Sequence, residues 1–138
     1  MTHHLSSLNH LPNDKNIYLT PAILKEIYQR VGITDYRLTD ISNYQQAFIH
    51  KSYVTRASEE LEIELQANEV LEFEGDGILG GYVARYLIER YPNEQEGFLT
   101  VIRSRLVETR SLARFAKYLG FDKYLIISKL VEEQKGRE

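Results

Sequence analysis

The sequence predicts an all-α fold built around one long central helix. Apolar residues recur at helical spacing from Asn68 to Tyr91, and Pro92 closes that segment. The length of 138 residues suits one domain with one core, and 43% hydrophobic with 27% charged residues is typical of a globular protein. Only residues 57–66 alternate in the manner of a strand, and no second strand is predicted nearby to pair with them.

Toward the amino terminus, residues 1–19 read as a flexible leader that precedes a domain over 20–138. Thr20 can cap a helix with Pro21 at its first position, and Gly32 ends that helix. Ser42 can cap a second helix, whose residues include Tyr44, Ala47, Phe48 and His50.

Downstream of the second helix, residues 57–66 are interpreted as an acidic connector or a ragged helix. Beyond the central helix, helices are predicted over 96–107 and 109–119, the latter stopped by Gly120. A short helix is predicted near 122–130. The whole pattern is helical, without repeats or internal linkers.

Three acids of the central helix fall on one stripe. At 100° per residue, Glu69, Glu72 and Asp76 lie within about 60° of each other. An apolar stripe that contains Ile78 and Tyr82 lies roughly 100° away, so we expect the carboxylates to flank the core. Like charges at this spacing repel, and no Lys or Arg sits within a turn. A divalent cation such as Mg²⁺ or Mn²⁺ is the natural partner for these hard oxygen ligands.

A simpler alternative stays open, because acids are also favoured at a helix start by the helix dipole. On that interpretation the three acids are merely solvated. Glu74, nearly opposite the stripe, is interpreted in this way.

The same helix also contains four glycines, which are unfavourable in a helix interior and therefore require an explanation. Each of them costs about 1 kcal/mol relative to Ala in a helix interior. Close approach by another helix or by a second copy of the chain is one explanation, and a kinked helix is the other. The residues are Gly75, Gly77, Gly80 and Gly81.

The charges are segregated along the chain. A net charge of −3 argues against a nucleic-acid binder, but eight acids and no Lys or Arg lie within residues 57–84. The other 12 acids stand against 17 bases, a net charge of +5. Zero Cys excludes disulfides, a thiolate nucleophile and cysteine zinc sites, and is compatible with an intracellular, cytoplasmic protein. No apolar run is long enough to span a membrane.

The segment 68–79, Asn-Glu-Val-Leu-Glu-Phe-Glu-Gly-Asp-Gly-Ile-Leu, closely resembles the signature helix of the ribonuclease III family. Flanking segments resemble the family in order and at family spacing, and the resemblance covers about residues 44–127. These segments are Ala47–Tyr53, Tyr91–Gly97, Arg105–Val107 and Ser111–Ala113, with Leu119-Gly120 after them. Val70 and Glu74 depart from the family pattern, and neither position is a ligand.

The resemblance implies a ribonuclease III-like helical endonuclease domain that hydrolyses double-stranded RNA with Mg²⁺, for which Mn²⁺ can substitute. It assigns Glu72 and Asp76 to the metal and adds Glu69 and Glu96 as further catalytic acids around the same cleft. It further implies a homodimer across the signature helix. Family domains continue with a helix that supplies another Asp and Glu, so we expect this domain to be C-terminally incomplete and the 138-residue form to be weakly active or dead.

Contacts with RNA phosphates are expected from Lys51 and from the basic residues of 97–129, which are Arg103, Arg105, Arg110, Arg114, Lys117, Lys123 and Lys129. For the residues of 97–129 an ordinary solvated helix face is an equal alternative, and for Lys51 a solvated residue is the more common case. His50 could act on a phosphate, but a hydrogen-bonded structural histidine is the more common case.

Two other classes of function remain as alternatives to the enzyme. One is a non-catalytic ribonuclease III-like module for RNA binding or dimerisation. The other is a generic acidic helical interaction domain, which leaves the multi-segment resemblance unexplained. The presence of all four acids (Glu69, Glu72, Asp76 and Glu96) favours the endonuclease.

Overall fold

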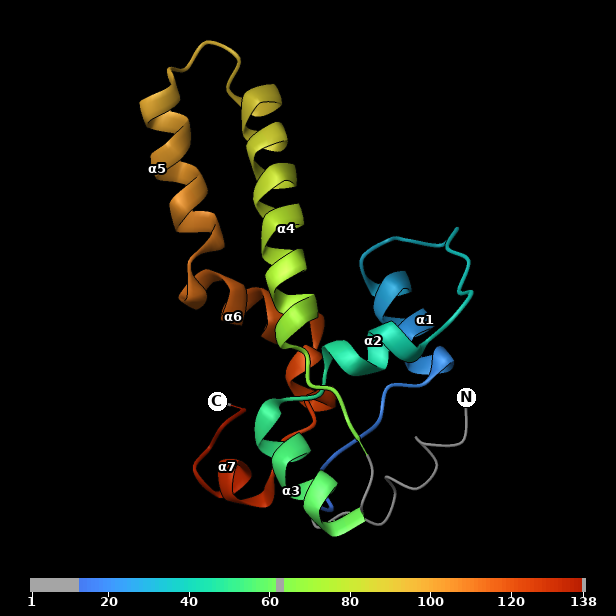
Figure 1. Ribbon diagram of the computed structural model, residues 1–138. Helices are drawn as coiled ribbons and strands as arrows, with labels where there is room; N and C mark the ends of the chain where they lie inside the picture. The colour runs from blue at the N-terminus through green and yellow to red at the C-terminus, as the bar shows by residue number, and fades with distance from the viewer. Residues whose placement is uncertain (1–12, 62–63, 138) are drawn as a thin grey trace. The chain divides into compact units, whose positions relative to one another are not determined.

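The computed structural model describes residues 13–61 and 64–137, which pack as two compact units (Figure 1). Unit 1 contains the described residues up to Asn68 and those from Asp122 onward, and unit 2 is Glu69–Phe121. The chain leaves unit 1 after Asn68, forms unit 2 from one continuous stretch, and then returns to unit 1.

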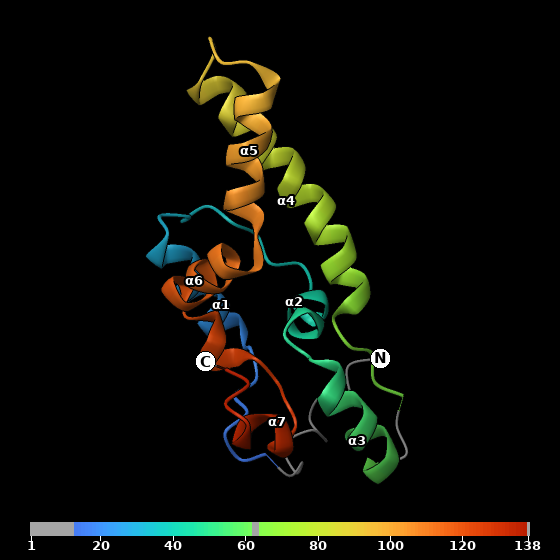
Figure 2. The ribbon, with the colours of Figure 1, turned by 90° about the vertical axis from the view of Figure 1, so that its left-hand side faces the viewer.

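Unit 2 consists of three helices that match the predicted ones. They are α4 (Glu69–Arg90), α5 (Glu96–Val107) and α6 (Thr109–Leu119). Helix α5 runs antiparallel to α4 (Figures 1 and 2). At the turn between them, the rings of Tyr91 and Phe98 meet edge to face with centroids 5.4 Å apart.

The predicted stops of these helices are also confirmed. Helix α6 ends at Gly120, which has a left-handed φ of 75° that an L side chain rarely adopts. The α5–α6 corner is held by the Ser111 hydroxyl, which donates to the Arg105 carbonyl at 2.7 Å. In the part of the chain that the structure describes, no helix is long and apolar enough to cross a membrane.

The apolar stripe of α4 does not form the core that the sequence predicts. Leu87 is buried at 1% exposure, whereas Ile78 is 53% and Tyr82 is 74% exposed. Ile78 lies nine residues from Leu87, about 180° around the helix, and only the side that carries Leu87 faces α5. Because α5 starts beside the carboxyl end of α4, it covers only that half of the helix.

Unit 1 is built from shorter helices. These are α1 (Pro21–Arg30), α2 (Ser42–Ala47), α3 (Lys51–Leu61), α7 (Lys129–Glu133) and the 3₁₀ helix η2 (Phe121–Tyr124), which spans the boundary between the units. As predicted, Thr20 caps α1, since its hydroxyl accepts the Ile23 amide at 3.3 Å. Gly32 follows the helix with a φ of 81°.

Two predictions in unit 1 need correction. Ser42 begins α2 but does not cap it; Asp40 instead accepts the Ser42 amide at 2.9 Å. His50 lies outside α2, because the helix ends at Ala47, Phe48 lies in a turn, and Ile49 forms an isolated parallel bridge with Ile126. In the interval 57–66, residues up to 61 complete α3, residues 64–67 have no regular structure, and 62–63 lie outside the described residues.

The core of unit 1 gathers around that bridge. Ile49, Tyr53, Ala57 and Ile126 are buried together, and the first three recur every fourth residue. The Tyr53 hydroxyl lies 2.6 Å from the Tyr18 hydroxyl. Burial, together with this hydrogen bond, raises the pKa of Tyr53 above its ordinary value. The pair therefore stays neutral and joins the amino-terminal segment to α3.

Residues 13–19 are packed, in contrast to the flexible leader that the sequence predicts. Asn13 and Leu19 are both buried. The Asn13 amide group donates to the Ile127 carbonyl at 2.9 Å, and the Ile127 amide donates to the Asn16 side-chain oxygen at 3.2 Å. These bonds satisfy both backbone groups of Ile127, so the segment is tied to unit 1. The rest of the predicted leader, residues 1–12, lies outside the described residues.

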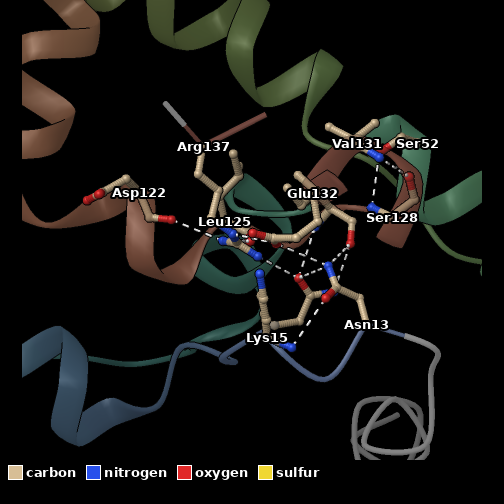
Figure 3. Close-up of polar contacts among 11 residues, drawn as sticks. Asn13, Lys15, Ser52, Asp122, Leu125, Ser128, Val131, Glu132 and Arg137 are labelled. Atoms are coloured by element: carbon tan, nitrogen blue, oxygen red, sulfur yellow. Dashed lines mark hydrogen bonds and ion pairs between the residues drawn. The ribbon is translucent and has the colours of Figure 1, made fainter. Parts of the chain in front are cut away.

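Arg137 is the centre of the polar network shown in Figure 3. Its Nε lies 2.7 Å from Glu132 Oε2, and the two side chains are only 17% and 12% exposed. Its other nitrogens donate to the Asn16 side chain at 2.8 Å and to the carbonyls of Asp122 and Leu125. Burial acts to raise the pKa of Glu132, but the bonds from Arg137 and Asn13 prevail and lower it. One arginine thus joins three separate stretches of unit 1.

Candidate active site

The first turns of α4 bring the predicted acids onto one face. Helix α4 begins directly after Asn68, whose amide donates to the Ile49 carbonyl at 2.9 Å. Glu69, Glu72 and Asp76 then follow at helical spacing, and all three are exposed. Glu72 and Asp76 are four residues apart, which is about 6 Å along the helix axis. The geometry of a single helix therefore fixes the pair.

Glu72 and Asp76 lack a counter-charge within the structure. No ion pair or side-chain hydrogen bond of the described residues reaches either carboxylate. The only basic residue in the last turn of α4 is Arg90, at the opposite end of the helix. Two exposed carboxylates at i and i+4 repel one another. A cation bound between them would therefore remove this electrostatic repulsion.

The donor set suits Mg²⁺ in particular. Mg²⁺ keeps several waters and is commonly bound through one or two carboxylates together with substrate phosphates. Glu72 and Asp76 offer such a pair. Over residues 13–61 and 64–137, no group of three or more His, Asp or Glu side chains could hold a metal ion.

Glu96 lies at the other end of the α4–α5 pair. It begins α5, and the Thr100 hydroxyl donates to Glu96 Oε1 at 2.8 Å. It borders a pocket of about 310 Å³ that is lined by Ala84, Leu87, Ile88, Leu99, Thr100 and Arg103. Ile88 and Asp76 are 12 residues apart on α4, about 18 Å along its axis. Within one chain, Glu96 therefore does not join Glu72 and Asp76 in one cleft.

The candidate RNA-binding residues are spread over both units. Lys51 is exposed at the start of α3 in unit 1, whereas Arg103 and Arg105 belong to α5 in unit 2. Two residues apart on a helix means about 200° of rotation. Arg103 and Arg105 therefore point to opposite sides of α5.

His50 has a structural role that its sequence position left open. Its Nδ1 accepts the Ser52 amide at 3.2 Å and lies 2.8 Å from the Ser52 hydroxyl. The Ser52 hydroxyl oxygen in turn accepts the Ser128 amide at 3.2 Å. This chain of bonds joins the start of α3 to the start of α7, and it matches the hydrogen-bonded histidine alternative.

Fold and site together define an all-α domain whose longest helix displays an exposed carboxylate pair. Residues 40–138 match the family model described as Ribonuclease-III-like, and the chain belongs to this family. The fold class and the family predicted from the sequence are thus confirmed.

Relatives and solved structures agree with this assignment. Over 112 residues, the chain is 40% identical to Ribonuclease 3 of Enterococcus faecalis and 38% identical to that of Streptococcus gordonii. Both matches cover 81% of the chain but 46% of the relative, so the chain spans about half the length of these relatives. The nuclease domain of ribonuclease III from Campylobacter jejuni superposes with a TM-score of 0.68 at 28% identity, covering 83% of this chain and 72% of that one. That structure concerns flexibility in a region involved in dimer formation.

Proposed function

We propose that the protein is a ribonuclease III-type endoribonuclease that hydrolyses phosphodiester bonds of double-stranded RNA with Mg²⁺. The observation that carries this proposal is the exposed pair Glu72 and Asp76, which lacks a counter-charge, in a chain of this family. The RNA substrate and the metal are inferred from the family and from the chemistry of the pair. A cytoplasmic location remains a prediction.

The roles of the residues follow from their positions on α4. Glu72 and Asp76 would hold the cation, and Glu69, one turn nearer the helix start, would orient water or phosphate on the same face. When bound, Mg²⁺ supplies a Lewis acid that lowers the pKa of water and neutralises charge on phosphate oxygens. The rigid helix would hold the two ligands at fixed spacing, so little reorganisation would accompany binding.

The direct test uses protein expressed from its complete reading frame. We expect it to cleave a 40-base-pair RNA duplex in Mg²⁺ or Mn²⁺ and to leave the duplex intact in EDTA. Single-stranded RNA and duplex DNA of the same sequence serve as matched substrates and should remain uncut. Folded protein that binds the duplex but never cuts it would contradict the enzyme and support the non-catalytic alternative.

We further propose a homodimer across α4. Phe73 is 84% exposed beside Glu72, and a Cβ built at Gly77, Gly80 or Gly81 meets no atom within 4 Å. An open face of this kind allows the backbone of a second helix to approach closely. A dimer would also explain why Glu96 lies far from Glu72 within one chain. A two-fold axis could bring Glu96 of a second copy to the cleft at Glu72 and Asp76.

Replacing Phe73 with Asp should separate the dimer, because the charge would be buried in an apolar contact. We expect sedimentation at 1–100 µM to show a dimer for the unaltered protein and a monomer for the variant. Tyr118→Asp is the matched control, since Tyr118 is 78% exposed but lies on α6. A Phe73→Asp protein that still sediments as a dimer would refute contact through this face of α4.

A further inference from the structure

Helix α6 carries a face of positive charge. Arg110, Arg114 and Lys117 are all exposed, and at 100° per residue they fall within about 60° of each other. The stripe is about 10 Å long, from the first turn of the helix to the last. Helix α6 (Thr-Arg-Ser-Leu-Ala-Arg-Phe-Ala-Lys-Tyr-Leu) contains no Asp or Glu. The positive charge of this face is therefore not offset within the helix.

Exposed faces of α4 and α1 mix the two signs. On α4, Arg85 pairs with Glu89 at 2.6 Å, four residues away, and on α1, Glu26 lies four residues before Arg30 on the same exposed face. No ion pair of the described residues involves the three α6 cations. If these cations only kept the helix surface solvated, a face of mixed charge, such as those of α4 and α1, would do so equally well.

The stripe also opposes the stability of its own helix. Like charges three and four residues apart repel each other. Arg110 adds to this cost, because it lies in the first turn, where the helix dipole disfavours a cation. Since helix formation does not explain these residues, an anionic partner is the more direct explanation.

The packing of α6 turns the stripe outward. Leu112, Ala116 and Leu119 are half-buried on the opposite side of the helix. Tyr118 is 78% exposed and lies about 40° from Arg114 around the axis, at the edge of the stripe. Its hydroxyl can donate to a phosphate, as tyrosines do in nucleic-acid complexes.

The topology of unit 2 places this face at the end that carries the acids. Helix α5 runs antiparallel to α4, and α6 follows it directly, so α6 lies toward the half of α4 that holds Glu72 and Asp76 (Figure 1). A long polyanion bound at the carboxylates would therefore pass close to α6.

We propose that Arg110, Arg114 and Lys117 bind consecutive phosphates of an RNA duplex and position its backbone, with Tyr118 at the edge of the contact. The inference rests on the proposed function and extends it to residues outside the acid cleft. Arginine forks match phosphate geometry, and a duplex presents the regular row of negative charges that a linear stripe requires. Specificity for base sequence is not expected from such contacts.

The test measures duplex binding by the 138-residue chain in EDTA, where cleavage is blocked. Fluorescence anisotropy follows a labelled 25-base-pair RNA at several KCl concentrations. The triple variant Arg110→Gln, Arg114→Gln, Lys117→Gln should raise the Kd at least about tenfold and lower the slope of log K against log salt by about 2 to 3. The control removes the same charge elsewhere, as Lys25→Gln, Arg85→Gln, Arg90→Gln, and should shift both quantities far less. Circular dichroism confirms that both variants remain helical.

Each outcome separates the inference from the proposed function. If the triple variant binds like the control, the α6 inference is overturned while duplex cleavage by the full protein can still stand. If the variant loses binding to polyglutamate but keeps duplex binding, the face recognises an acidic protein instead, which also overturns the inference. Absence of duplex binding by the unaltered chain at low salt would overturn the α6 inference, while cleavage by protein from the complete reading frame tests the proposed function separately.

Discussion

Replacing Asp76 with Asn in protein from the complete reading frame should slow cleavage of duplex RNA by about 10³-fold. Loss of one of two charged ligands removes about 4 kcal/mol of charge stabilisation in the transition state. Single-turnover cleavage rates at saturating enzyme measure this loss directly. The metal concentration that gives half-maximal rate should also rise, because Glu72 alone would hold the ion.

The same substitution should leave the fold intact. The Asp76 carboxylate is exposed, and no side-chain bond of the described residues reaches it. Its removal relieves repulsion with Glu72, so the free energy of unfolding should rise by a few tenths of a kcal/mol. Glu74→Gln is the matched control on the far side of α4, and its cleavage rate should stay within about twofold. Equal loss of rate in both variants would contradict a specific role for Asp76.

The helices of unit 2 could be predicted from the sequence because their signals are local. Apolar residues at helical spacing, Pro92 after α4 and Gly120 after α6 all act within a few residues. The face that holds Glu69, Glu72 and Asp76 follows in the same way, since spacing along a helix fixes direction. Helix α3 is harder to predict from the sequence, because acidic and apolar residues alternate over 57–66. This alternation hides the four-residue spacing of Tyr53 and Ala57, two buried residues of the helix.

Arrangements that depend on distant residues could not be predicted. Asn13 bonds to Ile127, 114 positions away, and no local signal marks a polar residue for such a contact. The apolar stripe of α4 was assigned to a core because periodicity reports which face is apolar, not which element covers it. Ile78 lies about 180° around α4 from Leu87, on the side that α5 does not cover.

Replacing Arg137 with Met should lower the free energy of unfolding by about 3 kcal/mol and the Tm by about 10 °C. The variant keeps the length of the side chain but leaves the Glu132 carboxylate, at 12% exposure, without its cation. The carbonyl of Asp122 and the side chain of Asn16 lose a donor as well. Urea denaturation followed by circular dichroism gives the energy. Hydrogen exchange of the Ile126 to Ser128 amides should accelerate, since these amides lie beside the network.

The ion pair of Arg85 and Glu89 on α4 is a matched control for this prediction. Its N–O distance of 2.6 Å is close to the 2.7 Å of Arg137 and Glu132, but its side chains are 77% and 63% exposed. A double-mutant cycle with Gln at each acid and Met at each arginine should give about 1–3 kcal/mol of coupling for the buried pair and below about 0.5 kcal/mol for the exposed pair. Equal coupling energies in the two cycles would show that burial does not determine the strength of these ion pairs.

The buried pair should also make the protein sensitive to acid. The pKa of Glu132 in the folded protein lies below its ordinary value of 4.5, so the unfolded chain binds the proton first as the pH falls. The stabilisation from this group is therefore complete above about pH 5 and is lost as the pH falls through the lower, folded-state pKa. Unaltered protein should lose this component between about pH 5 and 3, whereas the double variant Glu132→Gln, Arg137→Met should lack it. A double variant with the same acid dependence as the unaltered protein would assign the loss to other carboxylates, because the glutamine side chain that replaces Glu132 cannot titrate.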